Sequence, residues 1–300
     1  MAPPQGNPQE VALDLHLTAP YLIAFLACDT TISSCATPLT IIYLAQSDDG
    51  AHWQVVPGWR PFQGSVPDLI RRGQTLHIYT PGMLTRYHLD TGVLEATRPV
   101  PIEGVSGGFV ALSLILDDQG RLVLFFLHGQ MGGDPAVCAP EESRCQRQIG
   151  VATEVPGSDG SRFTLDADAG LTVEVGGATA CRSVSDPDIF FDGRQYVLYL
   201  SHGLSISVWT SPDLRGTYTL VDALPGGLLA SASGGVPAGY FDPVSGQYWT
   251  YAHYASGPNI PTVIRLTRPL AHASFTTILT GEQAGLGAGW MVGSPSFALN

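Results

Sequence analysis

The sequence predicts an all-β fold, a single five-bladed β-propeller of four-stranded antiparallel blades, and three observations lead to this prediction. The first is an internal repeat, because residues 65–79 and 185–199 read almost alike and similar patterns begin at Gly107 and Gly235. The second is that the apolar runs are short, β-branched and aromatic, with almost no helical periodicity. The third is a composition of 35 glycines, 23 prolines and only 13% charged residues, which suits short strands joined by tight turns.

We expect five blades of about four strands each, at a spacing typical of propellers. They cover about residues 10–58, 62–100, 105–166, 184–222 and 234–280. In the first blade, strands are expected at residues 11–17, 21–27, 39–45 and 52–56. Residues 1–9 look like a disordered leader, and no linker divides residues 10–300, so these are expected to form one domain. A two-sheet sandwich is the alternative arrangement.

The C-terminal segment, residues 293–300, begins Gly-Ser-Pro-Ser and resembles the start of a blade. We therefore expect it to supply the first strand of the N-terminal blade and to close the ring. Closure of this kind removes the open sheet edges that otherwise invite aggregation.

The charge balance excludes one class of partner. The net charge is −12, and all 14 basic residues are arginines. An acidic chain repels phosphate backbones, so no nucleic-acid partner is expected. We also expect no membrane span and a monomeric protein.

The cysteines indicate an oxidising compartment. Cys28 and Cys35 lie seven residues apart, and so do Cys138 and Cys145, which allows each pair to close a small loop as a disulfide. Cys181 is left over. Disulfides would place the protein outside the cytoplasm, secreted or periplasmic. The alternative is that all five cysteines are reduced thiols.

Several motifs resemble one family of propellers. Residues 185–201 read Ser-Asp-Pro-Asp-Ile-Phe-Phe-Asp-Gly-Arg-Gln-Tyr-Val-Leu-Tyr-Leu-Ser. Residues 47–53 and 158–163 are similar to a Ser-x-Asp-Gly turn followed by an aromatic residue. With these motifs the chain resembles the five-bladed propellers of the glycoside hydrolase family 43 and 32 superfamily. The resemblance implies a glycan-directed protein with carboxylates where the innermost strands begin, around a central pocket. The turn itself marks the fold more than the chemistry, because Asp and Gly form the bend and the aromatic packs between blades.

The resemblance suggests which carboxylates would act in a hydrolase. Asp68 and Asp188 occupy equivalent places in the second and fourth blades, and Glu103 lies upstream of the third. As a hydrolase, the protein would use these three as catalytic groups, with the two carboxyl groups that flank the scissile bond about 6.5–9.5 Å apart for inversion. The family's first-blade Asp and its Glu-Gly-Pro acid motif have no clear counterpart. The alternative is that Pro-Asp at a strand start is a turn and capping device.

Two polar residues near these positions are candidate substrate-binding groups. Asp186 lies two residues before Asp188, and residues two apart on a strand share a face. Ser296 takes the equivalent place in the closing strand, whereas the fifth blade has Ala238 there.

Three histidines recur at one place in successive blades. His128, His202 and His253 each end an apolar segment expected to be the second strand of a blade. This strand runs antiparallel to the first, so we expect the imidazoles on the same face as the aspartates, as substrate-binding groups. Equivalent places in neighbouring blades would be about 10 Å apart, which disfavours a shared three-histidine metal site. One histidine helping to hold a central divalent cation is the more reasonable metal hypothesis.

The sequence is therefore compatible with three functions. The first is a glycan-directed propeller, hydrolytic if the carboxylates act in the central pocket. The second is a non-catalytic propeller that binds a glycan or a protein on the same face, or serves as a scaffold. The third, less favoured, is a metal-dependent enzyme that uses the histidines; otherwise no cofactor is expected.

Overall fold

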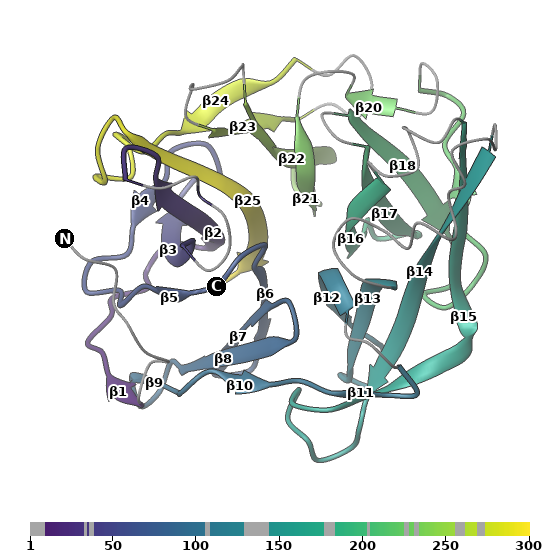
Figure 1. Cartoon of the computed structure of the whole chain (residues 1–300), viewed down its shortest axis with the longest axis horizontal. Helices are drawn as coiled ribbons and strands as arrows, with labels where there is room; N and C mark the ends of the chain where they lie inside the picture. Colours follow the sequence, from purple (N-terminus) through teal and green to yellow (C-terminus); the bar gives the residue numbers. More distant parts are fainter. Residues whose placement is uncertain are drawn as a thin grey trace. The chain divides into compact units, whose positions relative to one another are not determined.

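The computed structural model is all-β, and its strands form five small sheets that make a five-bladed β-propeller, as the sequence predicts (Figure 1). It describes residues 10–32, 35, 39–105, 109–128, 144–176, 184–202, 205–224, 228–230, 234–255, 262–268 and 274–300. The expected leader over residues 1–9 lies outside the described residues. Within the described part, no helix is long and apolar enough to cross a membrane.

Contacts divide the chain into two compact units. Unit 1 consists of Met1–Pro99, Tyr251–Leu266 and Phe275–Asn300. Unit 2 consists of Val100–Thr250 and Thr267–Ser274.

The first sheet joins the two ends of the chain. Its order is β25-β2-β3-β4, and β5 also pairs with β3. The strands are β2 (Tyr21–Asp29), β3 (Ile41–Ser47), β4 (Gln54–Val55), β5 (Phe62–Gln63) and β25 (Trp290–Leu299). The yellow β25 lies beside the purple β2 in Figure 1, and Tyr21 pairs with Leu299. The predicted closure by the C-terminal strand is confirmed.

The second sheet corrects the expected first strand. Its order is β1-β9-β8-β7-β6, with β10 on β8. The strands are β1 (Val11–Ala12), β6 (Asp68–Arg72), β7 (Thr75–Thr80), β8 (Met83–His88), β9 (Val93–Leu94) and β10 (Arg98–Pro99). The N-terminal segment was expected in the first blade, but β1 pairs with β9 and the N–H of Leu13 donates to Gly92 O at 2.7 Å.

The other three sheets follow the chain in order. The third is β11-β15-β14-β13-β12, the fourth is β16-β17-β18-β19 with β20 on β18, and the fifth is β21-β22-β23-β24. The third contains β11 (Ile102–Glu103), β12 (Phe109–Leu116), β13 (Leu122–His128), β14 (Arg144–Glu154) and β15 (Phe163–Gly176). The fourth contains β16 (Val184–Phe191), β17 (Tyr196–His202), β18 (Ser205–Ser211), β19 (Thr219–Leu220) and β20 (Leu228–Ala230). The fifth contains β21 (Gly235–Asp242), β22 (Gln247–Tyr254), β23 (Val263–Thr267) and β24 (Thr276–Leu279).

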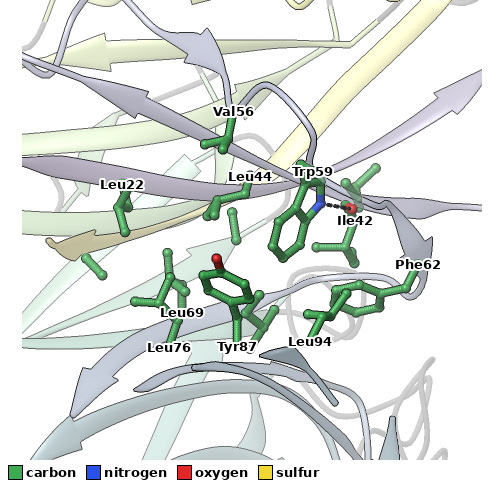
Figure 2. Close-up of a cluster of buried hydrophobic side chains, with 14 residues drawn as sticks. Leu22, Ile42, Leu44, Val56, Trp59, Phe62, Leu69, Leu76, Tyr87 and Leu94 are labelled. Atoms are coloured by element: carbon green, nitrogen blue, oxygen red, sulfur yellow. Dashed lines mark hydrogen bonds between the residues drawn. The ribbon is translucent and has the colours of Figure 1, made fainter. Parts of the chain in front are cut away.

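A buried cluster in unit 1 holds the first two sheets together. Figure 2 shows Trp59 and Phe62 packed with aliphatic side chains of both sheets, and Trp59 Nε1 donates to Ile42 O at 3.1 Å. The apolar residues at every second position from Val11 to Leu17 cover this cluster from outside. Apolar residues at every second position are typical of a strand, which explains the prediction of a strand over residues 11–17. Only Val11–Ala12 forms one, and the rest of the segment is an irregular stretch packed on the cluster.

The Ser-x-Asp-Gly turn at residues 47–53 has the structural role expected of it. Ser47 Oγ accepts the N–H of Gly50 at 2.9 Å, and Asp49 Oδ1 caps the bend by accepting the N–H groups of Ala51 and His52. Trp53 packs edge-on against Tyr251 with ring centroids 5.9 Å apart. The turn therefore fixes how the aromatic side chain of Trp53 packs against Tyr251, which also lies in unit 1.

Candidate functional site

The starts of five strands share an unusual backbone conformation. These strands are β25, β6, β12, β16 and β21, and we call them the leading strands because each lies at one end of its sheet's strand order. Each is associated with a non-glycine residue whose φ lies between 42° and 49°. This residue is two places before β6, second or third in β12, β16 and β21, and in the middle of β25; the five are Val66, Ala111, Asp186, Val236 and Ser294. Side chains seldom adopt this left-handed region, and β-branched residues do so least. Because such strain persists only where the surroundings enforce it, the five residues mark one device repeated in every blade.

The device is a break in strand pairing. The pairing register shifts at the left-handed residue in β12, β16 and β25, as expected for a β-bulge. In four of the five strands the next residue is proline, which has no N–H to contribute to the ladder. We call the left-handed residue the bulge residue. The residue two places further on is Asp68, Ser113, Asp188, Ala238 or Ser296.

In unit 1, Ser296 and Asp68 tie β25 to β6. Ser296 Oγ donates to Asp68 Oδ1 at 2.9 Å and accepts the N–H of Leu69 at 2.7 Å. The two residues are buried, with 3% and 5% of their surface exposed. Their hydrogen bonds join two leading strands, which is the capping role that the sequence left open for Asp68.

In unit 2, Ser113 and Asp188 repeat this arrangement between β12 and β16. The N–H of Ile189 donates to Ser113 Oγ at 3.1 Å, and Ser113 Oγ lies 3.5 Å from Asp188 Oδ1. The other carboxylate oxygen of Asp188 accepts the N–H of Gly239 on β21 at 2.7 Å. Asp188 is 8% exposed and connects three leading strands through these bonds.

Asp186 is the one ionisable side chain among the five bulge residues. The residue is partly exposed, and Ser185 Oγ donates to its Oδ2 at 2.5 Å. Desolvation of the carboxyl group raises the pKa of Asp186, and this hydrogen bond opposes the rise only in part.

Glu103 lies at the other end of its sheet. It is on β11, four strands from β12, which corresponds to about 19 Å at the usual strand spacing. Its side chain is half exposed, forms an ion pair with Arg162 and accepts a hydrogen bond from Thr164 Oγ1 at 3.5 Å. The structure therefore does not bring Glu103 to the start of β12.

Two of the three histidines end the second strand of their sheets, opposite the start of the first strand. His128 pairs with Phe109 and His202 pairs with Val184, each opposite the first residue of a leading strand. The side chain of His128 lies outside the described residues. His202 Nε2 is 2.8 Å from Ser207 Oγ on the next strand of its own blade.

Burial keeps two of these histidines neutral. It lowers the pKa of His202, and it lowers the pKa of His253 to about 4. His253 packs against β25, where a side chain at Gly293 would come within 3.3 Å of the imidazole Nδ1. Among the described residues, no group of three or more His, Cys, Asp or Glu is placed to hold a metal ion, so the central cation of the sequence hypothesis has no ligand set there.

One predicted disulfide is present. Cys28 and Cys35 are bonded, with their Cα atoms 5.7 Å apart. Cys138, Cys181 and the side chain of Cys145 lie outside the described residues.

Comparison with solved structures supports the fold assignment. No protein-family model and no curated protein matches this sequence. The fold is similar to that of RS223-β-xylosidase, at 15% identity and a TM-score of 0.56 over 88% of this chain and 92% of that chain. It is also similar to an α-L-arabinanase of Cellvibrio cellulosa, at 14% identity and a TM-score of 0.54 over 93% and 97% of the two chains. A thermostable family-43 glycoside hydrolase gives 12% identity and a TM-score of 0.52 over 76% and 85%. The expected resemblance to family 43 propellers is confirmed at the level of fold.

Sequence reasoning missed two features of the leading strands. The first is the series of bulge residues, which requires backbone angles to recognise. The second is Ser113, the counterpart of Asp68 in the third blade. A signal for it exists, because residues 110–113 align with the other copies once leucine is allowed at the place of the proline.

Proposed function

We propose that this chain is a glycan-binding propeller that does not hydrolyse glycosidic bonds with a carboxylate pair. The observation that carries the proposal is the chemistry of the strand starts. Of the five bulge residues only Asp186 has a carboxylate, and Asp68 and Asp188 are buried in hydrogen bonds between leading strands.

Glycoside hydrolysis by the usual mechanisms needs two carboxyl groups that flank the scissile bond. One group must donate a proton, and the other must activate water or attack the sugar. Asp186 could serve as one of them, whereas Asp188 accepts a backbone N–H from β21 and is 8% exposed. Glu103, the acid expected from the sequence, is at the far end of its sheet. These placements favour binding over turnover.

The glycan class rests on the fold. The similar structures include a protein named as a β-xylosidase and another named as an α-L-arabinanase. Fold likeness is an analogy and does not carry an activity by itself. We extend to this chain only the ligand class, a carbohydrate bound where the leading strands β12, β16 and β21 of unit 2 begin. His128 and His202, at the ends of β13 and β17 in unit 2, belong to the same proposed site.

We also propose that the protein works outside the cytoplasm as a monomer. The Cys28–Cys35 disulfide supports this compartment, because such bonds persist in oxidising environments.

Two measurements on the purified protein test the proposed function. Binding of xylo- and arabino-oligosaccharides is measured by calorimetry, and release of aryl groups from aryl glycosides is measured in parallel. We expect binding without turnover. Turnover of an aryl glycoside that is abolished both by Asp186→Asn and by Asp188→Asn would show that the protein is a glycoside hydrolase. Absence of binding to every glycan tested would favour a protein partner or a scaffold role.

A further inference from the structure

A pocket of about 270 Å³ lies in unit 1, at the opposite end of β6 from Asp68. It is lined by both polar and apolar side chains, among them Leu15, Leu17, Arg71, Gln74, Leu89 and Asn300. Arg71 is three residues beyond Asp68, which corresponds to about 10 Å along a strand. The pocket is therefore distinct from the Ser296–Asp68 hydrogen bonds. It belongs to unit 1, whereas the strands of the proposed glycan site belong to unit 2.

Asn300 holds the polar side of this pocket in place. Its Nδ2 donates to Leu17 O at 3.0 Å and to Ala19 O at 2.9 Å, and its backbone N–H donates to Pro20 O at 2.9 Å. Its Oδ1 accepts a hydrogen bond from Arg71 Nη1 at 3.2 Å. One residue thus ties the segment after β25 to residues 17–20 and to β6. The pocket is therefore built by contacts between three segments of the chain.

Arg71 brings an oriented positive charge to the pocket. Besides the bond to Asn300, its Nε donates to Gly73 O at 2.9 Å. Both acceptors are neutral, and the side chain is partly exposed where it lines the pocket. A guanidinium has five N–H donors in a planar fork, and these two bonds occupy two of them. The bonds fix the plane of the guanidinium, and its other donors can serve a ligand.

The lining selects a small carboxylate. A guanidinium fork matches a carboxylate with two parallel hydrogen bonds. The net charge of −12 favours an anion of one charge over a phosphate group of nearly two. A volume of about 270 Å³ is just below the range of about 300–1,000 Å³ that suits drug-sized ligands, so the pocket fits a single small molecule.

The other lining residues suit a hydroxylated ring. The amide of Gln74 has both donors and an acceptor, as recognition of hydroxyl groups requires. Leu15, Leu17 and Leu89 provide apolar surface for the C–H groups of a ring. A carboxylate, several hydroxyl groups and a ring with apolar faces occur together in a sugar acid.

We propose that this pocket binds a sugar acid, whose carboxylate pairs with Arg71 and whose hydroxyl groups contact Gln74. The ring lies against the three leucines. This site is additional to the proposed glycan-binding site in unit 2 and does not depend on it.

A matched pair of ligands tests the inference on the wild-type protein. Glucuronate and its neutral amide, glucuronamide, are titrated into protein with carbon-13-labelled leucine methyl groups, and NMR shifts are recorded. We expect glucuronate to bind about tenfold or more tightly than the amide, as a hydrogen-bonded charge pair would give. The methyl signals of Leu15, Leu17 and Leu89 should shift most. Inorganic phosphate, titrated in the same way, should bind more weakly than glucuronate.

Two arginine variants separate the pocket from general basicity. Arg71→Gln removes the charge and keeps a hydrogen-bonding side chain, so glucuronate should bind it no more tightly than glucuronamide does. Arg72→Gln is the matched control, because successive side chains on a strand point to opposite faces and only Arg71 lines the pocket. This control should keep the preference for glucuronate. The methyl spectrum of each variant without ligand verifies that it is folded.

Several results would overturn the inference. They are equal affinity for glucuronate and glucuronamide, no binding of either, phosphate binding as tight as that of glucuronate, or a preference that survives Arg71→Gln. Ligand-induced shifts confined to leucines outside the pocket would also overturn it, and this result needs no variant. None of these outcomes bears on the binding of xylo- and arabino-oligosaccharides, which tests the proposed function separately.

Discussion

Replacing Ser296 by alanine should lower the free energy of unfolding by about 3 kcal/mol. Its Oγ donates to Asp68 at 2.9 Å and accepts the N–H of Leu69 at 2.7 Å, and the residue is 3% exposed. A buried N–H that loses its acceptor costs about 1–3 kcal/mol, and a hydrogen bond to a charged group contributes about 1.5–3 kcal/mol. The two contributions share one oxygen atom and do not add fully, so we expect about 3 kcal/mol for both.

Urea denaturation followed by tryptophan fluorescence provides the measurement. The urea concentration at the denaturation midpoint should fall, while the m-value, the slope of the unfolding free energy against urea concentration, stays constant. The reason is that the variant changes stability and not the surface exposed on unfolding. Ser245→Ala is the matched control. Ser245 also donates to a carboxylate, Asp242 Oδ2 at 2.5 Å, but it lies in an exposed turn where water can replace the hydroxyl. Its substitution should cost at most about 0.5 kcal/mol.

The comparison can refute the structural role. A loss below about 1 kcal/mol for Ser296→Ala, or a loss equal to that of the control, would mean that the bond to Asp68 does not hold β25 to β6.

Three further outcomes are expected. Burial lowers the pKa of His253 to about 4, so between about pH 6.5 and pH 4 the imidazole is protonated in the unfolded chain and neutral in the folded chain. Acidification through this window should therefore lower the free energy of unfolding by up to about 3 kcal/mol. Urea denaturation at each pH should show a smaller decrease for His253→Asn. Replacing Cys28 and Cys35 by serine should cost about 2 kcal/mol, since the bond closes a loop of seven residues' separation, and urea denaturation without reductant measures this. Gly239→Ala should cost about 2 kcal/mol or more in the same assay, because a Cβ there would lie 2.1 Å from the ring of Phe190.

Each of these outcomes has its own check. For His253, a loss of stability on acidification that His253→Asn leaves unchanged would argue against the burial account. Reduction of the wild-type protein should match the cysteine variant. Phe190→Leu should reduce the loss of unfolding free energy caused by Gly239→Ala. If the double variant loses as much unfolding free energy as the two single variants added together, a clash with the Phe190 ring is not the cause.

The architecture could be predicted from the sequence because it depends on local repetition. Gly and Asp turns at regular spacing separate apolar segments with the period of strands, and these features are visible without any contact. The C-terminal Gly-Ser-Pro-Ser segment was assigned to the first blade by the same repetition, and β25 does pair with β2. The segment from Val11 to Leu17 was wrongly assigned to the first blade as a strand. Apolar residues at every second position suit an irregular segment that packs on a core as well as they suit a strand.

What the sequence alone determined is therefore the set of blades, the closing strand, the Cys28–Cys35 bond and the strand-end places of His128 and His202. Only the tertiary structure decided which partners the aspartates have. Asp68, Asp186 and Asp188 look alike as carboxylates in similar motifs, and the difference between them lies in their partners. Asp68 and Asp188 accept hydrogen bonds from neighbouring leading strands, whereas Asp186 sits on a left-handed bulge and is bonded to the adjacent serine. Such partners come from segments far apart in the chain, so the role of each carboxylate depends on contacts that no single stretch of sequence contains.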